Sequence, residues 1–156
     1  MSLIIGFRRG EIDLIAGCPP CQGFSALRTM NGRKRVHDPR NSLIREFFRF
    51  VDALRPRTVM LENVPGLAKE KLFREFCTKL SRIGYQIDWA VVDVAAFGVP
   101  QRRKRLILIA ARNRKITLLQ GNATRRTVRE AIGGLTVAGD SGDPAHDLKE
   151  KRNPKV

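Results

Sequence analysis

The sequence is poor in several features that mark other classes of protein. Its three cysteines are few and odd in number, which argues against a disulfide framework. No apolar run is long enough to cross a bilayer, and the arginines near the N-terminus follow the apolar residues, unlike those of a secretory signal. No internal repeat is present. An intracellular globular protein is therefore the default expectation, cytoplasmic and nucleoid-associated in a prokaryote or nuclear in a eukaryote.

Acidic residues are also scarce. Lys and Arg number 30 against 15 Asp and Glu, so the 156-residue chain carries a formal net charge of +15. Such an excess attracts polyanions and favours a nucleic-acid partner, although a ribosomal-type or merely solubilising surface would look similar. The positive residues lie mostly between the apolar segments, as in Arg33–Arg35, Arg102–Arg105 and Arg112–Lys115.

The apolar residues predict alternating strands and helices. Short apolar runs are typical of buried strands, and spacings of three and four residues are typical of amphipathic helices. An α/β sheet with helices on its faces follows from this alternation. The predicted strands are 12–16, 58–61, 86–94 and 106–110, and the predicted helices are 43–54, 72–83 and a short one opened by the capping box Thr127-Val-Arg-Glu130. Residues 139–156 are rich in Gly, Asp, Pro and Lys and are predicted to form a flexible tail.

Three loops next to these strands concentrate reactive or polar residues. Functional loops of open α/β sheets lie at the carboxyl ends of the strands. Loops 17–25 and 62–66 each follow a strand, and loop 97–105 leads into one. These three loops are the candidate site.

The first loop contains Cys18-Pro19-Pro20-Cys21, which is open to three interpretations. The spacing suits a thioredoxin-like redox pair. It suits equally a rigidly held nucleophile at Cys21, because the prolines fix the backbone. A metal site is disfavoured, since the further ligands available, Cys77, His37 and His146, lack zinc-finger spacing.

The other two loops contribute one acid and a basic run. Glu62 alone could be a solvated loop residue, and Gln101–Arg105 could be a surface charge run. Alternate residues point to opposite sides as a strand begins, so Gln101, Arg103 and Arg105 should share one side. From there they could reach the same pocket as Glu62.

Together these segments resemble the DNA cytosine-5 methyltransferases. Gly17-Cys-Pro-Pro-Cys-Gln-Gly-Phe-Ser25 is similar to the nucleophile motif of that family, Glu62-Asn63-Val64 to its glutamate motif, and 98–105 to its Gln-x-Arg-x-Arg motif. Segments 38–43 and 127–132 also match, and the order and spacing agree over roughly residues 11 to 135. The resemblance implies a partial Rossmann-like S-adenosylmethionine-dependent methyltransferase fold, the catalytic half of the sheet. It also implies a domain over 1–138, with the tail 139–156 leading toward a target-recognition region.

The resemblance implies a role for each matching residue. Cys21 would attack ring carbon 6 of cytosine, which makes carbon 5 nucleophilic. Glu62 would protonate ring nitrogen 3. Arg103 would hydrogen-bond the base carbonyl and fix the Glu62 carboxyl. Asn63 and Gln101 would support the loops.

Further residues are implied to contact the two substrates. The resemblance assigns Gln22, Ser25 and Arg105 to DNA, whose target base must flip out of the duplex. It assigns Pro20 and Leu43 to the methyl donor, S-adenosylmethionine. It implies no metal.

The match does not extend to all parts of the family. The Gly-rich turn that cradles the donor is not found before Cys18, so the strand 12–16 is expected to have one open edge and an uncovered apolar face. We therefore expect a chain that is catalytically incomplete alone, or a subunit of a split enzyme completed by a complementary chain. A non-catalytic basic nucleic-acid-binding module and thiol–disulfide exchange at Cys18 and Cys21 stay open as alternatives.

Overall fold

A computed structural model describes residues 6–20, 43–137 and 139–147 of the chain. It contains a sheet, helices and short 3₁₀ turns in the alternating order expected from the sequence, and this confirms the α/β fold class. The elements are β1 (Leu14–Gly17), α2 (Leu43–Leu54), β2 (Thr58–Asn63), η3 (Pro65–Lys69), α3 (Lys71–Arg82), β3 (Tyr85–Asp93), η4 (Val94–Phe97), β4 (Lys104–Arg112) and α4 (Val128–Ile132).

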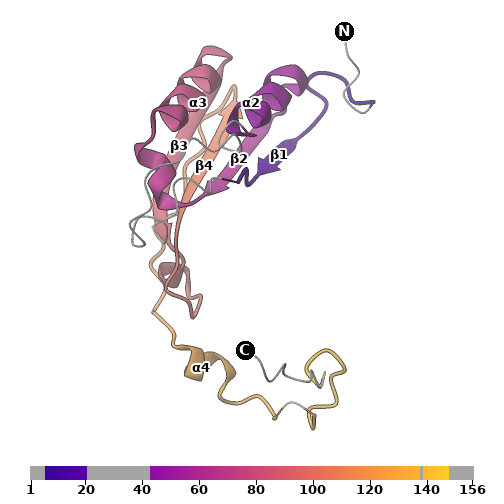
Figure 1. The fold of residues 1–156 in the computed structure, drawn as a ribbon, viewed down its shortest axis with the longest axis vertical. Coiled ribbons are helices and arrows are strands. Elements are labelled where there is room, and N and C mark those ends of the chain that lie inside the picture. Colours follow the sequence, from indigo (N-terminus) through magenta and orange to yellow (C-terminus); the bar gives the residue numbers. More distant parts are fainter. Residues whose placement is uncertain (1–5, 21–42, 138, 148–156) are drawn as a thin grey trace, which may run out of the picture.

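The four strands form one sheet in the order β1-β2-β4-β3. β1 and β2 are parallel, and β4 runs antiparallel to both of its neighbours. The amino end of β4 therefore lies at the same end of the sheet as the carboxyl ends of β1 and β2. Figure 1 shows this sheet with α2 and α3 beside it, and with α4 well away from it.

The core lies between one face of the sheet and the helices α2 and α3. Leu61 and Leu108 are fully buried on that face, and each contributes about 1.5–3 kcal/mol by leaving water. On the opposite face Leu14 and Met60 remain exposed. Among the described residues, these two exposed apolar side chains lie on β1 and on its neighbour β2. The main core residues are Ile44, Val51, Val59, Leu61, Phe73, Phe76, Leu80, Tyr85, Leu106, Leu108 and Ala110.

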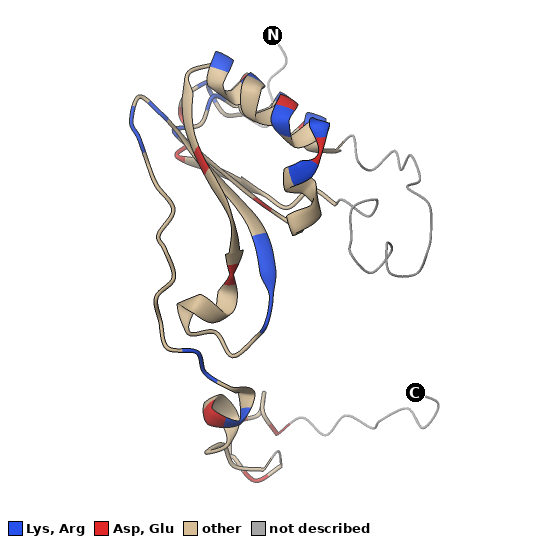
Figure 2. Ribbon diagram, turned by 90° about the vertical axis from the view of Figure 1, so that its left-hand side faces the viewer, with Lys and Arg blue, Asp and Glu red and all other residues tan. Residues whose placement is uncertain are grey.

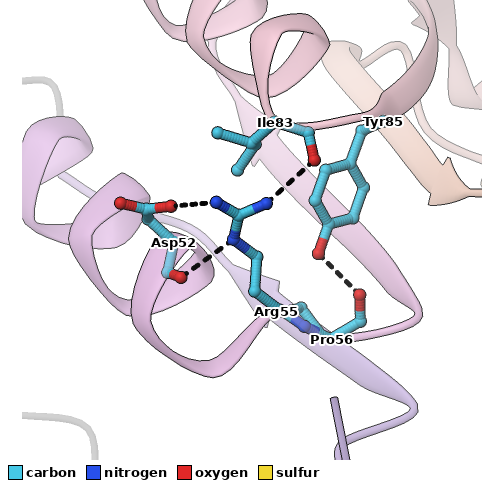
Figure 3. Close-up of polar contacts among 5 residues, drawn as sticks. All are labelled: Asp52, Arg55, Pro56, Ile83 and Tyr85. Carbon is cyan, nitrogen blue, oxygen red and sulfur yellow. Dashed lines mark hydrogen bonds and ion pairs between the residues drawn. The ribbon is translucent and has the colours of Figure 1, made fainter. Parts of the chain in front are cut away.

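Arg55, the residue directly after helix α2, has a left-handed backbone conformation (φ 49°). This conformation costs a non-glycine residue about 1 kcal/mol, and Pro56 prevents the helix from continuing. The Arg55 side chain offsets that cost, because Nε donates to the Asp52 carbonyl (3.0 Å), Nη1 to the Ile83 carbonyl (3.0 Å), and Nη2 pairs with the Asp52 carboxylate (2.8 Å). Figure 3 shows the guanidinium joining the end of α2 to the end of α3.

Tyr85, in the sheet, also binds the turn between α2 and β2. Its buried hydroxyl donates to the Pro56 carbonyl at 2.6 Å (Figure 3), and Arg112 Nε donates to the same oxygen at 3.1 Å. Burial, as the largest cause, raises the pKa of Tyr85. The turn between α2 and β2 is thereby held by both strands of the β3–β4 hairpin, at the open end where Tyr85 pairs with Arg112.

One expectation from the sequence is corrected in detail. Glu62 and Asn63 lie within β2 rather than in the loop after it. Trp89 in β3 is 44% exposed and packs edge-on against Phe73, with ring centroids 5.2 Å apart. The reason is that β3 is an edge strand.

The C-terminal segment has local order of its own. The capping box at Thr127 and Glu130 is present, which confirms that expectation. The Asp147 carboxylate accepts hydrogen bonds from the amides of Gly139, Ser141 and Gly142. No helix within the described ranges is long and apolar enough to cross a membrane.

Candidate active site

The described parts of the three loops singled out from the sequence lie at one end of the sheet. In the β2–β4 register Asn63 lies opposite Leu106, so the basic segment before β4 lies beside the end of β2. In the β1–β2 register Gly17 lies beside Leu61, so Cys18 follows at the same end as Glu62. Three neighbouring strands therefore bring their ends to a common point.

Glu62 forms an ion pair across the sheet with Arg105. The Nε–Oε1 distance is 2.7 Å, and both side chains are about three-quarters shielded from solvent, with 23% of Arg105 and 29% of Glu62 exposed. Glu62 lies opposite Ile107, and Arg105 stands two residues before Ile107, so both point to the face away from the helices. The guanidinium fixes the orientation of the carboxylate.

Arg103 does not share this contact. The family resemblance implied that Arg103 fixes the Glu62 carboxyl, yet its side chain is exposed and makes no hydrogen bond or ion pair with any described residue. Arg105, assigned to DNA, is the residue beside Glu62. Arg103 lies beyond the last paired residue of β2, where only its backbone is held, its carbonyl accepting from Val94 at 2.9 Å. Gln101 is likewise exposed, and its amide donates to the Val99 carbonyl at 2.7 Å.

Asn63 links the end of β2 to the first loop. It is buried, with 4% of the residue exposed. Its Nδ2 donates to the Pro19 carbonyl at 2.9 Å, and its Oδ1 accepts from the Val64 amide at 2.8 Å. This amide therefore fixes the loop just before Cys21 against the strand that carries Glu62.

The sequence suggested for Cys18 only a redox pair or a metal site together with Cys21. Cys18 is exposed, directly after the last residue of β1, and the neighbouring Glu62 changes the pKa of its thiol. Partial burial raises the pKa of Cys18, and a side-chain hydrogen bond with Glu62 and the charge of that carboxylate raise it further, while the Glu62 backbone amide lowers it. The pairing of β1 with β2, which places Cys18 next to Glu62, could not be predicted from the sequence of either segment alone.

The other residues expected in the site either are exposed or lie outside the part of the chain that the structure describes. Cys21, Gln22 and Ser25 lie outside the described residues. Pro20 and Leu43 are both exposed. Neither carries a polar side-chain group, so these two residues by themselves do not fit a nucleoside with a charged sulfonium.

The surroundings of the site are basic. Figure 2 shows Lys and Arg gathered where the chain enters β4, and others along α2 and α3. The described residues contain no cluster of His, Cys, Asp or Glu able to hold a metal ion.

A family model described as C-5 cytosine-specific DNA methylase matches residues 4–151. The chain belongs to this family. That membership confirms the resemblance seen in the three motifs.

Relatives and solved structures agree with the family. The type II methyltransferase M1.HphI of Haemophilus parahaemolyticus is 38% identical over 137 residues, covering 85% of this chain and 37% of the relative. Type II methyltransferase M1.BsuMI of Bacillus subtilis is 36% identical over 152 residues, covering 91% of this chain and 35% of the relative. Spodoptera frugiperda DNMT2 superimposes with a TM-score of 0.57 at 26% identity, over 77% of this chain and 39% of that one. The chain thus spans about a third of the length of the curated relatives it matches.

Proposed function

We propose that this chain provides the catalytic residues for transfer of a methyl group from S-adenosylmethionine to carbon 5 of cytosine in DNA, through a covalent adduct with Cys21. One observation carries the proposal. Glu62 stands at the end of β2 in an ion pair with Arg105, and the adjacent Asn63 holds the loop that leads to Cys21. Family membership supplies the reaction class.

The proposed chemistry needs a nucleophile and an acid together. Carbon 5 of cytosine is too weak a nucleophile to accept a methyl group unaided. When the Cys21 thiolate adds to carbon 6, a sulfur–carbon bond forms. The electron pair of the 5,6 double bond shifts through carbon 4, and negative charge develops on ring nitrogen 3. Protonation of ring nitrogen 3 by Glu62 neutralises that charge and leaves an enamine that is nucleophilic at carbon 5.

The remaining steps restore the ring. S-adenosylmethionine, when bound, supplies the methyl group. Water then takes the proton from carbon 5, the 5,6 double bond re-forms, Cys21 leaves as a thiolate, and Glu62 takes back the proton from ring nitrogen 3. Pro20 and Leu43 are proposed to contribute apolar contacts to the donor, whose polar groups need further partners.

The two arginines divide the remaining work in this proposal. Arg103 would hydrogen-bond the carbonyl oxygen of the base, where negative charge develops. Arg105 would hold Glu62 in place, as their ion pair supports. It would then act on the target base of the DNA only indirectly, by orienting the Glu62 carboxyl group. Loss of Arg105 should then impair Glu62 chemistry, whereas loss of Arg103 should impair stabilisation of the base.

DNA is the proposed partner. A base inside a duplex cannot reach these side chains, so the target must flip out, with Gln22 and Ser25 beside it. Exposed basic residues such as Arg102 and Lys104 are placed to neutralise phosphates next to the site.

A chimera with a relative tests the proposal. Residues 11–135 would replace the matching segment of M1.HphI, so that the relative supplies the remaining two-thirds of the enzyme. The chimera would be incubated with S-adenosylmethionine and 5-fluorocytosine DNA carrying a site that M1.HphI methylates, because fluorine at carbon 5 blocks loss of the adduct. We expect a complex stable to denaturation, absent in Cys21→Ser and weakened in Glu62→Gln.

The controls separate misfolding from lack of chemistry. Cys77→Ser removes a thiol far from the site and should leave trapping intact. A chimera that melts cooperatively and binds donor but forms no adduct would overturn the proposal. Sequence-independent duplex binding without trapping would instead support a non-catalytic basic module.

A further inference from the structure

Glu62 is approached from both strands that flank β2. Arg105 reaches it from β4, with its Nε 2.7 Å from Glu62 Oε1. On the other side, Cys18 follows the last residue of β1, which pairs in parallel with β2 through Gly17 and Leu61. The next residues along the two strands, Cys18 and Glu62, are therefore neighbours.

The direction of the Cys18 side chain follows from the strand. Gly17 faces α2, because a Cβ atom there would lie 2.4 Å from the Phe47 ring. Successive residues of a strand point to opposite faces, so Cys18 points away from the helices. Leu61 is fully buried against the helices, so Glu62 points to the same side as Cys18. The thiol and the carboxylate thus share one face and one end of the sheet.

The contact between the two residues is chemical as well as spatial. The Glu62 carboxylate raises the pKa of the Cys18 thiol, and the Glu62 backbone amide lowers it. A neutral thiol is a donor, whereas a thiolate would be repelled by the carboxylate. Each of the two donors therefore restrains the carboxylate from a different neighbouring strand.

We propose that Cys18 is a positioning residue for Glu62: its thiol donates a hydrogen bond to the carboxylate and, opposite Arg105, holds the acid in the orientation in which it meets the base. This inference rests on the proposed function of Glu62. Cys18 is thus distinct from Cys21 in role, the first being a neutral donor and the second a nucleophile.

The contact is measurable in the isolated chain without any catalysis. Site-resolved alkylation with iodoacetamide, followed by peptide mass spectrometry across a pH series, gives the titration midpoint of each thiol. We expect the Cys18 midpoint to lie above that of an ordinary thiol in the wild type and to move down toward it in Glu62→Gln. The shift should be partial, since burial is its largest cause. Cys77 is the internal control, because burial alone raises its midpoint and Glu62→Gln should leave it unchanged.

The consequence for turnover is tested in the M1.HphI chimera. Cys18→Ala should lower kcat by about two- to tenfold, the worth of one hydrogen bond, with KM for DNA unchanged. Cys18→Ser keeps a donor of similar size and should restore most of the rate and the wild-type pH profile. A merely structural role would not distinguish Ser from Ala in this way.

The two proposals fail separately. An unchanged Cys18 midpoint in Glu62→Gln, or equal rates in Cys18→Ala and wild type, overturns the positioning role even if the Cys21 adduct forms. Absence of the Cys21 adduct overturns the proposed function, while a Glu62-dependent Cys18 midpoint would still establish the contact.

Discussion

Replacing Asn63 with alanine removes the side chain that ties Pro19, in the loop after β1, to β2. In the native chain this amide donates to the Pro19 carbonyl at 2.9 Å and accepts from the Val64 amide at 2.8 Å. Asn63→Ala leaves both backbone groups without these partners. Because Asn63 is 4% exposed, water cannot readily replace them without a rearrangement of the loop.

The magnitude follows from two hydrogen bonds and the groups they satisfy. Each bond contributes about 1 kcal/mol net, and a buried group left unsatisfied costs about 1–3 kcal/mol. If the loop relaxes enough to hydrate one of the two backbone groups, the loss for Asn63→Ala is about 2–4 kcal/mol. That is a large share of the total of about 5–15 kcal/mol typical of a native domain.

Urea denaturation of the chain, followed by circular dichroism, measures this loss. Asn63→Ala should move the midpoint down with an unchanged slope, since the same surface is exposed on unfolding. Asn63→Asp is the matched variant, because it keeps an acceptor for Val64 but sets a buried carboxylate against the Pro19 carbonyl. Asn63→Asp should therefore lose stability as the pH rises through the pKa of that carboxyl. A loss below about 0.5 kcal/mol for Asn63→Ala, the range of surface substitutions, would refute the reasoning.

Three further changes test the packing around the site. Gly17→Ala places a Cβ 2.4 Å from the Phe47 ring and should cost about 1–3 kcal/mol in urea unfolding, a result that additional Phe47→Leu would relieve. Tyr85→Phe removes one of two donors to the Pro56 carbonyl and should cost about 1 kcal/mol by thermal unfolding, with no change meaning that the hydroxyl is not a net contributor. Burial raises the pKa of Cys77 to about 11, so the unfolded chain loses that proton first and stability should fall as the pH rises from about 9 to about 11. Cys77→Ala should abolish that part of the pH dependence.

Much of the fold could be predicted from the sequence because its periodic patterns are local. The helix from Leu43 to Leu54 and the capping box at Thr127 were correct to within a residue. Family membership confirms the resemblance drawn from the three short motifs. Each of these depends on residues close together in the chain.

The pairing of residues across the sheet could not be predicted in the same way. Alternation placed Arg103 and Arg105 on the side of Glu62 but could not tell which of them is beside it. That depends on the register, in which Glu62 lies opposite Ile107 and leaves Arg103 past the end of β2. Cys18 was missed for the same reason, because only the parallel register of β1 and β2 puts it next to Glu62.

The β3–β4 hairpin tolerates an added residue at some positions near the site and not at others. Asp93 and Lys104 close the ladder, and residues 94–103 form the connection between them. One residue added within 98–101 can be absorbed by that connection while Arg105 keeps its side of the sheet. One residue added between Arg105 and Leu106 would turn the guanidinium toward the helices and separate it from Glu62.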